Sequence, residues 1–166
     1  MHHARSVWSK MGNYAKHCTR CKTNKPCKRR HVYAMELNPA IAKEPWFLEM
    51  NPDYQEGQPC LYVGKTIHHP LCRKSMHMNC RGNEWNEQVW TCVCHRKPGV
   101  NACGYGNRTS RARVSKHMTG FLRPRLYKYI NPQRGPGPND EAEYQLATDL
   151  RAKGMGVYTD ATAEEE

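Results

Sequence analysis

The chain has 166 residues, with 26 Lys and Arg, 15 Asp and Glu, nine His, nine Cys and a formal net charge of +11. This length predicts one domain, and a hydrophobic content of 38% fills one modest core. Because there is neither an apolar run of about 18 residues nor an apolar N-terminal segment, we expect no membrane span and no signal peptide. We therefore expect a cytoplasmic protein with no membrane partner, whose basic surface binds a polyanion, nucleic acid above all.

The positive charge is concentrated in two segments. Residues 1–34 carry nine Lys and Arg, residues 89–139 carry ten, and neither segment contains an acidic side chain. If the fold brings these segments together, they form one positive face; the alternative is a basic but merely solvated surface. The chain ends in acidic residues, and we expect 160–166 to be a disordered acidic tail.

In chain order, the first 30 residues show no helical or strand period and form a basic, cysteine-rich arm. The pattern of residues 31–37 predicts a strand, and residues 60–64 predict a second, short strand that is closed by a glycine. Pro70 suits the first turn of a helix that runs to about Met78.

The second half of the chain begins with residues 78–110, which have no usable periodicity and read as an insertion held together by something other than a core. Short basic helices or turns follow. A helix is predicted from Asp140 to Lys153, with Gly154 as its C-cap, and then an edge strand at 156–159. The predicted fold class is α/β of the α+β kind, a small antiparallel three-stranded sheet flanked by helices, within one domain at 31–159.

Three cysteines of the arm have the spacing of a metal site. Cys18 and Cys21 form a Cys-x2-Cys pair, and Cys27 follows six residues later. Two thiolates at this spacing bind one ion from a tight turn, as in structural zinc sites, and the surrounding cations favour deprotonation of the thiols. The fourth ligand is left open among three candidates, which are His17, His31 and Cys72.

A second group of four cysteines lies in the unpatterned insertion. A four-cysteine zinc site would order a segment that lacks a hydrophobic pattern, with His95 as a substitute ligand. We thus predict one or two structural Zn²⁺ ions. Free or redox-active thiols and disulfides are the alternatives, and Cys60 reads as a small core residue. The four cysteines are Cys80, Cys92, Cys94 and Cys103.

A further set of residues carries a family resemblance. The strings His31-Val32-Tyr33 and Tyr62-Val63-Gly64 resemble the two halves of the GIY-YIG nuclease motif. Lys65 comes next, then Arg73 and His77 at an R-x3-H spacing, and Glu143 lies on the predicted C-terminal helix. The resemblance covers residues 31–77 and about 111–159. It implies a Mg²⁺-dependent endonuclease that hydrolyses duplex or branched DNA, with site-specific cleavage of the restriction-enzyme kind as a subsidiary expectation.

The resemblance also implies roles for these residues. One of Tyr33 and Tyr62 would take the proton of the attacking water, with its pKa lowered by Lys65, Arg73 or His77. The Arg73 fork suits the scissile phosphate, and Glu143 would bind a single Mg²⁺ ion.

Plainer interpretations stay open. The tyrosines could be packing residues of strands, and Arg73 and His77 could be a solvated helix face. Glu143 could close a capping box with Asp140, although it shares the apolar face of its helix. The segment after that helix lacks an Asn that many members carry. The rival function is a catalytically inert, zinc-stabilised nucleic-acid-binding protein, and cutting both strands of a palindrome would call for a homodimer or two binding events.

Overall fold

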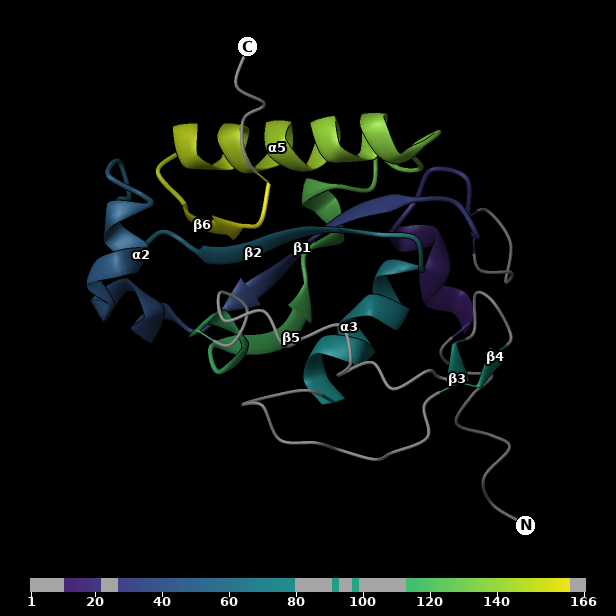
Figure 1. The fold of residues 1–166 in the computed structure, drawn as a ribbon, viewed down its shortest axis with the longest axis horizontal. Coiled ribbons are helices and arrows are strands. Elements are labelled where there is room, and N and C mark those ends of the chain that lie inside the picture. The colour runs from purple at the N-terminus through teal and green to yellow at the C-terminus, as the bar shows by residue number, and fades with distance from the viewer. Residues whose placement is uncertain (1–10, 22–26, 80–90, 93–96, 99–112, 162–166) are drawn as a thin grey trace.

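The computed structural model describes residues 11–21, 27–79, 91–92, 97–98 and 113–161. Its centre is one mixed four-stranded sheet in the order β5-β1-β2-β6, with helix α5 over one face and helix α3 over the other (Figure 1). These elements are β1 (His31–Leu37), β2 (Cys60–Thr66), α3 (Pro70–Asn79), β5 (Met118–Leu122), α5 (Pro136–Ala152) and β6 (Gly156–Thr159). The α/β class and the helix from Pro70 are as predicted, whereas the three-stranded antiparallel sheet is wrong.

The two central strands pair antiparallel over their whole length. Tyr33 lies opposite Gly64, and Met35 lies opposite Tyr62. Nearly every residue of β1 and β2 is buried because helices cover both faces of the sheet. A strand buried on both sides reads as an apolar run rather than as an alternation, which is why both segments are visible in the sequence.

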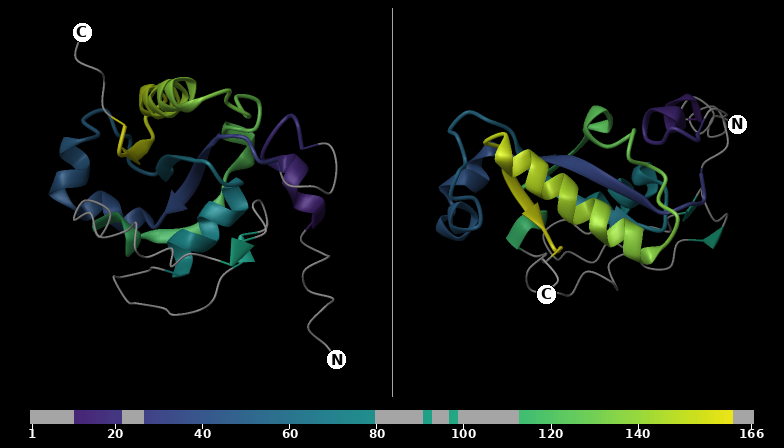
Figure 2. Two further views of the ribbon diagram at one scale, coloured as in Figure 1. Left: turned by 45° about the vertical axis from the view of Figure 1, so that its right-hand side comes forward. Right: turned by 90° about the horizontal axis from the view of Figure 1, so that it is seen from above.

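The edge strand predicted at 156–159 is found as β6, and the sheet differs from the prediction in the added strand β5 and in the direction of β6. β5, which the sequence pattern places between two helices or turns, pairs antiparallel with β1 through an irregular register between Met35 and Leu37. Its five residues include a glycine, which weakens a strand, so the pairing with β1 determines it. β6 pairs parallel with β2, because α5 crosses the sheet before the chain returns (Figure 2, right).

Helix α5 begins earlier than predicted. Its N-cap is Gly135 and its first residues are Pro136 to Pro138, so Asp140 lies inside the helix and the capping-box interpretation of Glu143 is wrong. Prolines fit this first turn, where a backbone N–H has no partner within the helix. At the other end, Gly154 has φ +80°, its N–H donates to the Arg151 carbonyl at 2.8 Å, and the Met155 N–H donates to Leu150 at 3.2 Å. This is the glycine-terminated cap that the sequence predicts.

The remaining elements are short. Within the arm, η1 (Met11–Lys16) is a 3-10 helix where no period was visible. After β1 the chain forms η2 (Pro39–Lys43) and α2 (Pro45–Glu49), at the end of the sheet opposite η1 (Figure 1). Two-residue strands β3 (Thr91–Cys92) and β4 (Lys97–Pro98) pair antiparallel, and η5 (Pro124–Leu126) follows β5. No helix in the described part of the chain has the length and apolar character needed to cross a membrane.

Candidate active site and metal centre

The two predicted catalytic tyrosines lie side by side on β1 and β2. The ring centroids of Tyr33 and Tyr62 are 5.9 Å apart, and both side chains are buried. Gly64 makes this arrangement possible, since a Cβ at that position would lie 2.6 Å from the Tyr33 hydroxyl and 2.8 Å from the Tyr62 ring. The glycine that closes the second motif is therefore required by the close approach of two tyrosine rings.

Helix α3 brings the predicted Arg73 and His77 to the same place. The Tyr33 hydroxyl and His77 Nε2 are 2.6 Å apart, a hydrogen-bond distance, and the His77 ring centroid is 5.1 Å from that of Tyr62. The R-x3-H spacing puts both side chains on one face of the helix, as predicted. Arg73 Nε is buried and has no hydrogen-bond partner in the described part of the chain.

The electrostatics of Tyr33 are set mainly by its burial. Loss of solvent raises the pKa of this phenol, and the nearby Arg73 guanidinium opposes the rise without cancelling it. Arg73 itself keeps its charge, because the tyrosine oxygens outweigh its desolvation and raise its pKa. Tyr33 is accordingly a neutral hydroxyl at pH 7.

The predicted Glu143 lies on the buried stripe of α5. Its side chain is 3% exposed, and Oε1 accepts a hydrogen bond from Thr159 Oγ1 at 3.3 Å. Oε2 lies 3.6 Å from Lys65 Nζ, which is too long for a hydrogen bond, and has no partner in the described part of the chain. Burial raises the pKa of this carboxyl, while Lys65 and Thr159 pull it down. The inward orientation inferred from the helical face is correct.

Lys65 joins this group from β2. Its Nζ lies 2.7 Å from Asp140 Oδ1. Asp140 lies one helical turn before Glu143 and therefore belongs to this site, although the sequence suggested only a capping role for it. Burial disfavours the charge on Lys65, but the two carboxylates outweigh burial and raise the pKa of the amine. The negative charge of Glu143 adds a minor contribution to the raised pKa of Tyr33, for which burial is the main cause.

Sequence reasoning also missed the residue that begins α3. His69 precedes the helix and its Nδ1 accepts a hydrogen bond from the Leu71 N–H at 3.2 Å, in the manner of an N-cap side chain. Its ring centroid lies 4.5 Å from that of Tyr14 and 5.6 Å from that of His31. Burial lowers the pKa of His69 to about 3, so the ring is neutral and can accept this bond. Its place just before Pro70 is the only signal of the cap in the sequence.

A second cluster, formed by the arm and the start of β1, has the composition of a metal centre. The ligand atoms of Cys18, Cys21, Cys27 and His31 all lie within 4.8 Å of one another. Neither nitrogen of the fully buried His31 ring has a hydrogen-bond partner in the described part of the chain, so one of them is available as a metal ligand. Three thiols and one imidazole are a common tetrahedral set for structural zinc. The cluster can hold a metal ion such as zinc.

The other two candidates for the fourth ligand lie outside this cluster. The Nδ1 atom of His17 lies 2.5 Å from the Tyr127 hydroxyl, and burial lowers the pKa of His17 to about 4. Cys72 is buried on α3. Within the cluster, a hydrogen bond from Cys21 lowers the pKa of Cys18 to about 4, and the same bond raises that of Cys21.

The second predicted cysteine group, Cys80, Cys92, Cys94 and Cys103, lies outside the described residues except for the backbone of Cys92 in β3. The predicted zinc site in the insertion therefore stays a prediction. Most of the acidic tail, 162–166, is outside them as well.

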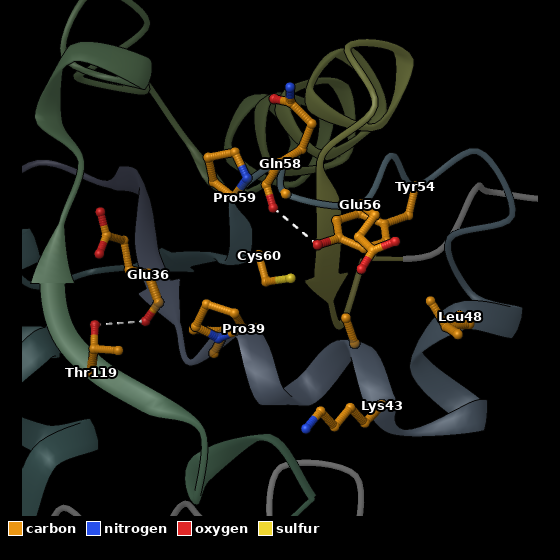
Figure 3. Close-up of a pocket in the computed structure, with 13 residues that line it drawn as sticks. Glu36, Pro39, Lys43, Leu48, Tyr54, Glu56, Gln58, Pro59, Cys60 and Thr119 are labelled. Atoms are coloured by element: carbon orange, nitrogen blue, oxygen red, sulfur yellow. Dashed lines mark hydrogen bonds between the residues drawn. The ribbon is translucent and has the colours of Figure 1, made fainter.

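A pocket of about 720 Å³ opens away from the catalytic candidates, between the ends of β1 and β2 and the segment 39–59 (Figure 3). Cys60 faces it, and burial raises the pKa of this thiol, which leaves it a poor nucleophile. The pocket contains none of the predicted site residues. Cys60 is a core residue at the start of β2, as predicted.

Comparison with known proteins adds no assignment. No family model matches the chain, and no curated protein and no solved structure matches it either.

Proposed function

We propose that this protein is a Mg²⁺-dependent endonuclease of GIY-YIG type that hydrolyses DNA phosphodiester bonds. The observation that carries the proposal is that four side chains chosen from sequence alone meet between β1, β2 and α3, and that the other two, Lys65 and Glu143, pair with each other beside α5; the four are Tyr33, Tyr62, Arg73 and His77. Together these side chains supply a hydroxyl–imidazole pair, a buried guanidinium, an amine and a buried carboxylate. Coincidental packing of strand tyrosines would not also leave the buried Arg73 Nε and Glu143 Oε2 without hydrogen bonds in the described part of the chain.

Phosphodiester hydrolysis needs a bond from water oxygen to phosphorus, loss of the water proton and departure of the ester oxygen. Tyr33 donates its proton toward His77 Nε2 in this scheme, and its oxygen is then free to accept the proton of the attacking water. The proton thus passes from water through Tyr33 to His77, and the phenol need not be ionised beforehand. This route accommodates a pKa of Tyr33 that burial raises.

Arg73 and Lys65 stabilise negative charge in this scheme. The Arg73 Nε–H lacks a partner and would donate to a phosphate oxygen in the geometry that a guanidinium fork favours. Lys65, about half-exposed beside Glu143, would neutralise charge on the departing oxygen, which then takes a proton from solvent. Both cations are in place before substrate arrives, Arg73 beside Tyr33 and Lys65 beside Glu143, so little reorganisation accompanies charge development.

Glu143 fits the expected Mg²⁺. A carboxylate oxygen is the protein donor that this ion prefers, and Oε2 of Glu143 is buried and without a hydrogen bond in the described part of the chain. When bound, the ion would supply positive charge to the phosphate. Asp140 would remain with Lys65, to which it is bonded at 2.7 Å.

Plasmid nicking tests the proposal. Wild-type protein should nick supercoiled DNA with Mg²⁺, and Glu143→Gln and Arg73→Lys should each cut at least about 100-fold more slowly while binding DNA normally. Glu141→Gln, an exposed change of the same chemistry two residues away on α5, is the matched control and should cut like wild type. Undiminished cleavage by both site variants would overturn the residue assignment.

The rival is an inert, zinc-stabilised nucleic-acid-binding protein. The raised pKa of Tyr33 and the segment after α5, which contains no Asn, favour it to some extent. Wild-type protein that shifts duplex DNA on a gel but leaves plasmid intact in Mg²⁺ would support this function over the first.

A further inference from the structure

A basic surface is formed by two segments that are far apart in the sequence. One is the arm, residues 14–21 and 27–31, and the other is the loop at 123–134. Neither contains an acidic residue. Apart from Arg123, which is paired with Glu36, none of their Lys and Arg side chains forms an ion pair with another described residue. These unpaired cations, here called the basic platform, are Lys16, Arg20, Lys28, Arg29, Arg30, Arg125, Lys128 and Arg134.

Asn131 joins the arm to the loop. Its Nδ2 donates to the carbonyls of His17 and Val32, both at 2.9 Å, and its Oδ1 accepts from the Val32 N–H at 2.9 Å. Its backbone carbonyl accepts from the Thr19 hydroxyl at 2.8 Å. Asn131 is buried, and both its amide nitrogen and its amide oxygen are hydrogen-bonded, so it holds the two segments in one relative position.

Two more contacts continue this junction. His17 Nδ1 lies 2.5 Å from the Tyr127 hydroxyl, and Gln133 donates its N–H to the Arg30 carbonyl at 2.8 Å. Lys16 precedes His17, Lys128 follows Tyr127 and Arg134 follows Gln133, so platform cations flank this junction in both segments. The fold thus brings together parts of the two acid-free stretches that the sequence keeps far apart.

Besides the junction at Asn131, the metal cluster gives the arm a second point of attachment. In the described part of the arm the apolar cluster is small, formed by Tyr14, Cys18 and Cys21 with Cys27 and Leu71 packed against it. Three metal-ligand candidates belong to that cluster. A bound ion would replace the missing core, so that a run of unpaired cations can be held rigidly instead of being spread over a flexible chain.

The loop also presents an aromatic ring among these cations. Tyr129 is 75% exposed, and Lys128 Nζ lies 4.6 Å above its ring centroid. An exposed ring that a cation orients can stack against a sugar or a base, and this contact does not depend on salt as a phosphate contact does.

We propose that the basic platform binds the phosphate backbone of duplex DNA and that Tyr129 adds a stacking contact. This inference rests on the proposed function for its choice of DNA, and it names the surface that holds the substrate. His31 begins the strand that carries Tyr33 two residues later, so the platform is anchored directly beside the candidate active site. Figures 1 and 2 place η1, in purple, at the end of the sheet where β1 begins.

Fluorescence anisotropy on a labelled 24-base-pair duplex, with zinc-loaded protein and no Mg²⁺, tests the platform. The triple variant Arg20→Ala, Arg29→Ala, Arg134→Ala should bind at least about tenfold more weakly at 0.1 M salt. Its slope of log affinity against log salt should be less steep by about 2–3, because each phosphate contact contributes about 0.9. Tyr129→Ala should weaken binding about tenfold and leave the slope unchanged.

The matched control removes three exposed cations outside the platform, in the variant Lys43→Ala, Arg113→Ala, Lys153→Ala, and should keep a steeper slope than the platform variant. An unchanged affinity and slope in the platform variant, while wild type cuts plasmid, would overturn the inference and leave the proposed function standing. If wild-type protein binds DNA through the platform but never cuts it, the inference stands and the proposed function is overturned. Tighter binding to duplex RNA or to anionic vesicles than to DNA would also overturn it.

Discussion

Gly64→Ala is the sharpest perturbation of the tyrosine pair. The added Cβ would lie 2.6 Å from the Tyr33 hydroxyl, and ordinary contact begins at 3.4 Å, so the ring and the strand must separate by about 0.8 Å. Tyr33 is fully buried and its hydroxyl is bonded to His77, so the ring has no space to move into. Overpacking of this kind costs about 1–3 kcal/mol.

The sign of the effect distinguishes sterics from backbone propensity. Replacing a strand glycine by alanine would by itself stabilise the fold by about 0.5–1 kcal/mol. We expect the clash to win and the free energy of unfolding of zinc-loaded protein, measured with urea, to fall by about 1–2 kcal/mol. Nicking should fall as well, because the Tyr33–His77 bond must be displaced.

Gly137→Ala is the matched control for this experiment. A Cβ there meets nothing within 4 Å, and the residue lies in the first turn of α5. Gly137 also precedes Pro138, whose ring disfavours helical backbone at a residue that has a Cβ, so this change should alter the free energy of unfolding by no more than about 1 kcal/mol. A Gly64→Ala variant as stable and as active as wild type would refute the geometry inferred for the tyrosine pair.

Three further predictions concern the metal, a buried hydroxyl and a buried amide. Cys21→Ser should lower the zinc content measured by mass spectrometry by one ion per chain and lower the melting temperature, whereas Cys72→Ser should leave the zinc content unchanged; equal losses would contradict the cluster. Tyr127→Phe should cost about 1–3 kcal/mol at pH 7, because His17 Nδ1 loses its partner. Burial raises the pKa of Tyr127, so the unfolded chain releases this proton first and stability falls as the pH rises above about 10, by up to about 1.4 kcal/mol per unit. The variant should show a shallower fall in alkaline urea titrations, and an unchanged slope would contradict the raised pKa. Asn51→Ala should cost about 2–4 kcal/mol in urea, since its amide makes three hydrogen bonds that tie α2 to α5 and β6; a loss below about 1 kcal/mol would contradict this role.

The sequence predicts best what depends on local pattern. The two central strands are continuous apolar runs, Pro70 marks a helix start, and Gly154 marks a helix end, and each is found where predicted. Chemistry-bearing residue types at fixed spacing were also found together, as the hydrogen bond between Tyr33 and His77 shows. The strands, the helix start and the helix end can be predicted from the sequence because each depends on residues only a few positions apart.

What the sequence does not predict depends on contacts between distant segments. β5 forms only because β1 offers an open edge, and β6 is parallel only because α5 crosses the sheet. Asn131 lies in a stretch that reads as a loop, and its role appears only when the arm, more than 100 positions earlier, packs against it. The choice of His31 over Cys72 as a cluster member likewise requires the position of β1 relative to the arm.

The metal cluster and the candidate active site share one strand and one helix start. His31 and Tyr33 are two positions apart on β1, so their side chains lie on the same face of the sheet. The ring of His69, which caps the helix carrying Arg73, lies against the ring of His31. A metal ion that held His31 would therefore restrain both the strand of the tyrosine and the helix of the arginine. The charge-rich arm would then be anchored at the end of β1 from which the strand leads to Tyr33.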